Sequence, residues 1–175
     1  MIENTASKFN GLVGFILYGP DVTVKDSTAS YNGDVGFYVQ DVFDQDFTFT
    51  NTAKFEGTVS SHHNLRMGFV IGTQAQVIDF ANSIEVIVKG QVNAYLNEFE
   101  GLLVENKGNP SYNVLFTVED EGLFSSCQNV EIDIVSRSGV VNFNDEGGAG
   151  YTCDTSAEVF GAQGLPICVP CPACT

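Results

Sequence analysis

Residues 28–37 read Thr28-Ala29-Ser30-Tyr31-Asn32-Gly33-Asp34-Val35-Gly36-Phe37 and echo an earlier stretch, Thr5-Ala6-Ser7-Lys8-Phe9-Asn10-Gly11-Leu12-Val13-Gly14-Phe15. The two Thr-Ala-Ser triplets are 23 residues apart, and the Asn-Gly and Gly-Phe pairs are 22 residues apart. Residue-level repetition at a fixed spacing is typical of proteins built from stacked structural units. The stretch therefore predicts a repeat architecture.

Further copies of the unit follow at less regular spacing. Thr52-Ala53-Lys54-Phe55-Glu56-Gly57 resembles the opening of the unit 24 residues on, and Gly68-Phe69 follows 32 residues after Gly36-Phe37. The longer spacing predicts an insertion of eight to ten residues in the turn around Ser60-Ser61-His62-His63. Weaker copies are Gly101-Leu102-Leu103-Val104, Gly122-Leu123-Phe124 and Gly150-Tyr151-Thr152.

Short runs of alternating polarity lie between the Gly-Phe pairs and have the period of two that half-buried strands show. They are residues 22–25, 47–50, 77–80, 114–118 and 130–135. The best helical window, residues 92–99, lacks a capping Ser or Asp, so low helix content is expected. A unit of 22 to 24 residues cannot bury its own apolar face and must stack on a neighbour.

Stacking predicts columns of equivalent side chains. We expect Phe15, Phe37 and Phe69 to lie above one another at the strand spacing of ~4.8 Å. The Asn-Gly and Glu-Gly pairs at 10–11, 32–33, 56–57 and 100–101 are expected to form the bends, because Asn and Gly tolerate positive φ. The alternative is an antiparallel β-sandwich, which also has short alternating strands but no reason to repeat residue by residue.

The pattern Ser/Ala-x-x-Asn-Gly-x-x-Gly-Phe-x-Val, followed by a Val-Thr-Val strand, resembles the coils of the pectin-lyase-like superfamily over about residues 5–155. The resemblance implies an all-β fold, a right-handed parallel β-helix (solenoid) of about five to six coils. It further implies a β-helix domain over residues 1–155 and a Cys/Pro-rich capping tail over residues 156–175, similar to the ending of some secreted β-helix proteins. Enzymes, adhesins and structural proteins share this packing signature, so it implies architecture and not activity.

All five cysteines fall in the last third of the chain, which predicts covalent stapling of its C-terminal end. They are Cys127, Cys153, Cys168, Cys171 and Cys174. We expect Cys127 or Cys153 to pair with a tail cysteine and fasten the proline-rich tail over the last coil, in an oxidising, extracellular setting. The alternative is a metal or iron–sulfur site on Cys168-x-x-Cys171-x-x-Cys174, whose fourth ligand would have to come from Cys153 or Cys127.

The charge balance excludes two classes of partner. The chain has 22 acidic and 7 basic residues and a formal net charge of −15 at pH 7. Nucleic acids and anionic bilayers bind clustered Lys and Arg, which this chain lacks. The longest apolar run, residues 12–18, is far shorter than the roughly 20 residues of a spanning helix. We therefore expect neither nucleic-acid binding nor membrane insertion.

Two groups of side chains are candidate sites. His62, His63 and Arg66 are predicted as binding residues because projecting loops on rigid scaffolds carry function. Adjacent histidines in a strand-like segment should face opposite sides, which argues against a shared metal ion. Asp41, Asp44 and Asp46 form an acidic turn that could hold Ca²⁺ weakly, although it lacks the spacing of a dedicated loop; the alternative is that these acids only keep the surface soluble.

The expected function is a non-catalytic extracellular structural or adhesive module. Its expected partners are glycans or neighbouring copies, in a homo-oligomer or a larger assembly, and Ca²⁺ is the one cofactor considered. The first alternative is a polysaccharide lyase or epimerase. By the resemblance, a lyase would need acids that hold Ca²⁺ beside an Arg or Lys base, and neither Arg66 nor Arg137 has an acidic neighbour on its strand face. The balance is against an enzyme. The second alternative is a metal or iron–sulfur protein based on the cysteine tail.

Overall fold

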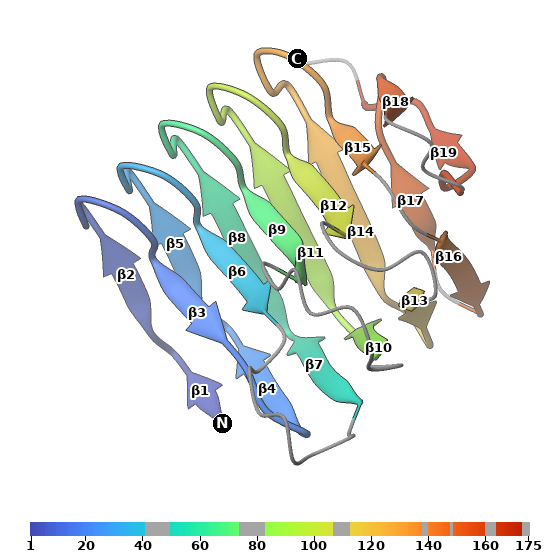
Figure 1. Ribbon diagram of the computed structural model, residues 1–175, viewed down its shortest axis with the longest axis horizontal. Helices are drawn as coiled ribbons and strands as arrows, with labels where there is room; N and C mark the ends of the chain where they lie inside the picture. Colours follow the sequence, from blue (N-terminus) through green and yellow to red (C-terminus); the bar gives the residue numbers. More distant parts are fainter. Residues whose placement is uncertain are drawn as a thin grey trace.

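The computed structural model shows a parallel β-solenoid of three sheets, and it describes residues 1–40, 50–73, 83–106, 113–137, 140–147, 149–159 and 164–172 (Figure 1). Successive strands visit sheets A, B and C in turn, and we call one such passage a winding. The strands pair in parallel with their counterparts one winding away. No helix occurs in these residues, and so none that could cross a lipid bilayer.

The strand bounds are as follows. Sheet A contains β1 (Ile2–Glu3), β4 (Val22–Lys25), β7 (Asn51–Glu56), β10 (Ser83–Val88), β13 (Asn113–Glu119) and β16 (Val140–Glu146). Sheet B contains β2 (Ala6–Lys8), β5 (Thr28–Ser30), β8 (Thr58–His62), β11 (Gln91–Tyr95), β14 (Leu123–Cys127), β17 (Gly150–Thr152) and β19 (Cys168–Val169). Sheet C contains β3 (Phe15–Leu17), β6 (Phe37–Gln40), β9 (Phe69–Thr73), β12 (Leu102–Asn106), β15 (Ile134–Arg137) and β18 (Ser156–Val159).

The predicted column of phenylalanines is present in sheet C. The ring centroids of Phe15 and Phe37 are 4.9 Å apart, and those of Phe37 and Phe69 are 5.1 Å apart. Phe55 from sheet A meets Phe37 and Phe69 edge-on, so the three sheets share one apolar core. The solenoid prediction is confirmed and the antiparallel sandwich is excluded.

The predicted place of the insertion is wrong. Thr28 pairs with Ser60 and Ala29 pairs with Ser61, so the third copy of the Thr-Ala-Ser triplet lies in β8. Ala53, which the sequence pattern assigns to that copy, pairs with Val22 in sheet A. The connection from sheet B to sheet C spans six residues in each of the first five windings, namely 9–14, 31–36, 63–68, 96–101 and 128–133. The lengthened connection is the one from β6 to β7, residues 41–50, against residues 18–21 between β3 and β4.

Other local predictions met with mixed outcomes. Residues 22–25 and 114–118 are strands, and Gly101 precedes a strand of sheet C as expected. Gly122 instead precedes β14, and Gly150 begins β17, both of which are strands of sheet B; of residues 130–135 only the last two are in a strand. The helical window 92–99 contains most of β11, in keeping with the low helix content that we predicted. Residues 47–49 and 77–80 lie outside the described residues.

The corners between sheets B and C have a repeated conformation. At each corner a residue in the left-handed conformation, with φ between 53° and 61°, is followed by an asparagine. The pairs are Phe9-Asn10, Tyr31-Asn32, His63-Asn64, Leu96-Asn97 and Gln128-Asn129. The bend that we predicted at Asn10-Gly11 and Asn32-Gly33 thus depends on the residue before each asparagine. Of the other two predicted bends, Gly57 has the expected positive φ, 62°, whereas Gly101 does not have a positive φ.

The corner asparagines form a ladder of side-chain hydrogen bonds along the solenoid. In each step the Nδ2 of one asparagine donates to the Oδ1 of the next at 2.9–3.0 Å, and the backbone N–H donates to the same oxygen. Asn32, Asn64 and Asn97 are fully buried. A buried amide group is costly unless it is hydrogen-bonded, so the ladder fixes which residues of successive windings face each other.

The ladder also explains the glycine of the Gly-Phe pairs. A Cβ on Gly68 would lie 2.8 Å from the Nδ2 of Asn97 and 2.6 Å from the carbonyl oxygen of Gly101. A Cβ on Gly36 would lie 2.9 Å from the Nδ2 of Asn64. Each glycine is therefore needed because the asparagine amide and a backbone carbonyl of the following winding, and at Gly36 also the Ser61 hydroxyl, leave no room for a Cβ.

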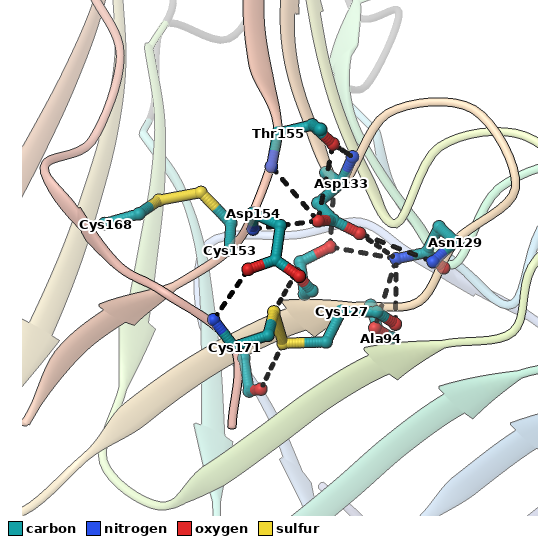
Figure 2. The surroundings of a disulfide bond; sticks show 11 residues. Ala94, Cys127, Asn129, Asp133, Cys153, Asp154, Thr155, Cys168 and Cys171 are labelled. Atoms are coloured by element: carbon teal, nitrogen blue, oxygen red, sulfur yellow. Dashed lines mark hydrogen bonds between the residues drawn. A yellow bond between two sulfur atoms is a disulfide. The ribbon is translucent and has the colours of Figure 1, made fainter. Parts of the chain in front are cut away.

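Asp133 ends both the asparagine ladder and the glycine column (Figure 2). It occupies the position that Gly101 has one winding earlier, since Leu102 pairs with Ile134. One carboxylate oxygen accepts from the Nδ2 of Asn129 at 3.0 Å. The other accepts from the backbone N–H groups of Asp154 and Thr155 at 3.0 and 3.3 Å. The buried carboxylate thus supplies the acceptor that a sixth asparagine would otherwise supply.

We expect Asp133→Asn to lower the free energy of unfolding by about 2 kcal/mol, because one of the two acceptors becomes an NH₂ group facing N–H donors. Urea denaturation measures this loss. The control is Asp120→Asn, because Asp120 is exposed and has a φ of 53°, which asparagine tolerates. Equal stability of the two variants, within about 0.5 kcal/mol, would refute the role of Asp133.

Candidate functional site

The outer face of sheet B is nearly free of charge. One outward column contains Thr28, Ser60, Asn93 and Ser125, and the column beside it contains Lys8, Ser30, His62, Tyr95 and Cys127. Lys8 is the one Lys, Arg, Asp or Glu among the residues of β2, β5, β8, β11 and β14. Most of this face therefore presents hydroxyl, amide and aromatic groups.

Sheet A differs from sheet B because its outer face carries ion pairs between neighbouring windings. The Nζ atoms of Lys25 and Lys89 lie 3.2 and 3.1 Å from carboxylate oxygens of Glu3 and Glu119. Hydrogen bonds to these carboxylates raise the pKa of both lysines. A further pair joins Lys54 to Asp21 at 2.9 Å. The lysines of these three pairs are thus engaged in ion pairs between windings of the solenoid.

Aromatic rings stack along the corner next to the outer face of sheet B. We call Phe9, Tyr31, His62, His63 and Tyr95 the aromatic corner. The ring centroid of Tyr31 lies 5.3 Å from that of Phe9 and 4.9 Å from that of His63. The ring of Tyr95 stacks on that of His62 at 4.8 Å. Stacking follows from the register, because equivalent positions of successive windings are one strand spacing apart.

The two histidines face each other, which contradicts the expectation that they point to opposite sides. The Nδ1 atoms of His62 and His63 are 2.8 Å apart and share a hydrogen bond. The reason is backbone conformation: His62 ends β8, but His63 has a φ of 53° and lies at the corner. Alternation of side chains along a strand does not apply to a left-handed residue.

Arg66 does not join the histidines in the described structure. Its guanidinium lies 3.2 Å from a carboxylate oxygen of Asp34 one winding earlier, and its side chain is exposed. The structure therefore brings together two of the three predicted binding residues. The predicted calcium ligands Asp41, Asp44 and Asp46 lie outside the described residues.

Partial burial shifts two pKa values in the aromatic corner. The pKa of His62 is lowered from 6.5, first by burial and then by the nearby His63 and Lys8. Burial also raises the pKa of Tyr95, with a smaller contribution from Tyr31. His62 therefore stays neutral to lower pH than an ordinary histidine, so one of its two ring nitrogens keeps an available lone pair.

A groove of about 220 Å³ lies beside Tyr95, on the face of its ring that His62 leaves uncovered. It is lined by Asn93, Ala94, Tyr95, Ser125, Cys127, Gln128 and Pro172. Sequence reasoning missed these polar and aromatic lining residues, because their proximity depends on the register between β11 and β14 and on the path of the tail. The one signal was the pair of cysteines that ties the tail to β14.

Two disulfides hold the tail against the solenoid, as predicted (Figure 2). Cys153 is bonded to Cys168, and Cys127 is bonded to Cys171. Strand β19 extends sheet B by pairing with β17. The disulfides indicate an oxidising environment. These four sulfur atoms offer no thiolate to a metal ion while they are bonded, and Cys174 lies outside the described residues.

Asp133, Asp154 and Cys171 bring two carboxylates and a sulfur within 4.8 Å of one another. The sulfur is bonded to Cys127, and an oxygen of Asp154 accepts the backbone N–H of Cys171 at 2.9 Å. Both oxygens of Asp133 accept hydrogen bonds as described above. The group is therefore explained as an anchor for the tail.

We expect the double substitution Cys127→Ala and Cys171→Ala to lower the free energy of unfolding by about 2–4 kcal/mol, because a closure of 44 residues is lost. Limited proteolysis with mass spectrometry should also show faster cleavage within residues 164–172. The matched control is the wild-type protein, before and after mild reduction. Unchanged stability and unchanged cleavage would contradict the anchoring role.

The lowered pKa of His62 predicts a pH dependence of stability. Below pH 6.5 the unfolded chain binds a proton at this position before the folded protein does, so stability falls as the pH drops from 6.5 toward the folded pKa. His62→Gln should reduce this fall when urea denaturation is measured at a series of pH values between about 5 and 7. An identical slope in wild type and variant would contradict the prediction.

No protein-family model, no curated protein and no solved structure matches the chain.

Proposed function

We propose that this chain is a secreted, non-catalytic β-solenoid module that binds a neutral glycan on the outer face of sheet B. The groove beside Tyr95 is the observation that carries the proposal. Its volume of about 220 Å³ is smaller than the roughly 300–1,000 Å³ of sites that enclose drug-sized ligands. That volume suits one sugar ring of a longer chain that continues along the sheet.

The chemistry of the lining residues suits a sugar. Tyr95 offers an aromatic ring face, on which the apolar C–H face of a pyranose can pack. Asn93, Ser125 and Gln128 offer amide and hydroxyl groups that both donate and accept, as the hydroxyls of a sugar do. Outward residues of successive windings repeat at the strand spacing of ~4.8 Å, which gives an extended ligand equivalent contacts along the face.

Charge favours a neutral ligand. The chain has a net charge of −15 at pH 7, and the outer face of sheet B is the part where the described strands have almost no charge. An anionic polysaccharide would be repelled by the protein as a whole. Secretion agrees with the two disulfides. Membership of the pectin-lyase-like superfamily remains part of the proposal, supported by the parallel solenoid and by the asparagine ladder.

Affinity gel electrophoresis tests the proposal. Soluble glucan, mannan and xylan serve as neutral probes, and polygalacturonate serves as the anionic one. We expect retardation by at least one neutral probe and none by polygalacturonate. Tyr95→Ala should weaken binding at least fivefold, because it removes the ring face, and Asn93→Ala should weaken it by a smaller factor.

Two control variants separate the groove from general effects. Tyr95→Phe keeps the ring and should keep most of the affinity. Gln91→Ala changes an exposed residue of the same strand that does not line the groove, so it should bind like the wild type. Absence of binding to every neutral probe, or equal binding by Tyr95→Ala and wild type, would overturn the proposal. Release of reducing ends or unsaturated products would favour the lyase or epimerase alternative.

A further inference from the structure

The histidine pair of the aromatic corner brings its two Nδ1 atoms to the separation of two ligands on one metal ion. The two Nδ1 atoms are 2.8 Å apart and the ring planes are inclined by 80°. Two nitrogen ligands about 2.0 Å from a metal ion and at right angles to each other are ~2.8 Å apart, whereas tetrahedral ligands are ~3.3 Å apart. The observed separation therefore fits neighbouring positions of a tetragonal ion such as Cu²⁺.

Neighbouring rings hold both imidazoles in this arrangement. Tyr95 stacks on His62 with an interplanar angle of 13°, and Tyr31 stacks on His63 with an angle of 18°. Both histidines are half-buried. Ring orientations fixed before binding lower the entropic cost of forming a chelate. The left-handed conformation of His63 also fixes the pair before binding, because it turns this side chain toward His62.

A buried hydroxyl next to the pair lacks a hydrogen-bond partner. Ser30 precedes His62 by one winding in the same outward column and is 0% exposed. Among the described residues its Oγ has no hydrogen-bond partner. An unsatisfied buried hydroxyl is costly and calls for an explanation. A hydroxyl one strand spacing from His62 can bind the metal ion directly or bind a water molecule on it.

We propose that His62 and His63 chelate a divalent transition-metal ion, best fitted by Cu²⁺, through their Nδ1 atoms, with Ser30 and water as further oxygen donors. In the metal-free pair one Nδ1 carries the proton of the shared hydrogen bond. Binding requires both Nδ1 lone pairs, so this proton moves to the Nε2 of its own ring. Imidazole nitrogen is a ligand that Cu²⁺ and Zn²⁺ prefer over the carboxylates abundant elsewhere in this chain.

Titration with Cu²⁺ at neutral pH tests the site in the full chain. Excess Mg²⁺ occupies exposed carboxylates without competing for imidazole. The chain has no tryptophan, so tyrosine fluorescence reports quenching by an ion near Tyr31 and Tyr95. Electron paramagnetic resonance of the 1:1 complex should show imidazole nitrogen ligands, and His62 and His63 are the only histidines of the chain.

Single substitutions should each weaken Cu²⁺ binding at least roughly tenfold, because each removes one of two nitrogen ligands. His63→Gln is the primary variant, since Gln128 already occupies the equivalent corner with a φ of 61° and shows that glutamine fits there. His62→Gln is the second. Leu96→Gln is the matched control, because it changes the corner of the next winding and leaves both histidines in place.

Lys8 provides a further test by electrostatics. Lys8 lies in the same outward column as Ser30 and His62, so its positive charge disfavours a cation bound there. Lys8→Gln should therefore strengthen Cu²⁺ binding by a small factor of about two to three. The proposal is overturned if His63→Gln binds Cu²⁺ within about twofold of the wild type, if Leu96→Gln weakens binding as much as His63→Gln, or if no imidazole nitrogen couples to the copper. None of these readouts depends on glycan binding.

Discussion

The chain of amide hydrogen bonds between the corner asparagines is the interaction on which the rest of the structure depends. Asn32, Asn64 and Asn97 are buried, and the side-chain amide of each is satisfied when the asparagine of the next winding stands directly above it. A shift of one residue between windings would leave these groups unpaired and would also turn every strand's apolar side chains outward. The ladder and the apolar core therefore demand the same register.

Several other features follow from that register. The glycine column exists because the asparagines need the space, and the phenylalanines after it stack because their backbones are aligned. The aromatic corner arises one residue before the ladder, where the left-handed conformation turns side chains toward one another. The candidate sites are thus consequences of the way in which the solenoid is stacked, and they sit on backbone that packing holds rigid.

The architecture could be predicted because it depends on identical residues at fixed spacing. Gly14, Gly36 and Gly68 stand in one column, and the sequence shows it directly. The error over Thr52-Ala53-Lys54 arose because strands of sheets A and B alternate in the same way, so a short similarity cannot tell them apart. The sequence did not identify Asp133 as important, because its role depends on the hydrogen bond that its carboxylate accepts from Asn129, the last asparagine of the ladder.

The candidate sites were less predictable than the fold. The sequence identified His62 and His63, but their mutual orientation depends on a positive φ at a residue that is not glycine. The groove beside Tyr95 joins two neighbouring strands and Pro172 from the tail, positions that are far apart in the chain. The sequence did indicate that Cys127 or Cys153 would bond to a tail cysteine, but the pairing itself came from the structure.

The ladder has a direction, and this limits how such a chain can change its length. In each bond between two ladder asparagines the donor is the one nearer the N-terminus, and the carboxylate of Asp133 only accepts. Duplication of a complete 32- or 33-residue segment upstream of Asp133, such as residues 64–96, would preserve each donor and acceptor of the ladder. A segment added after Asp133 would meet no free donor from the ladder. Gene duplication could therefore lengthen the rod in whole steps on one side of that aspartate only.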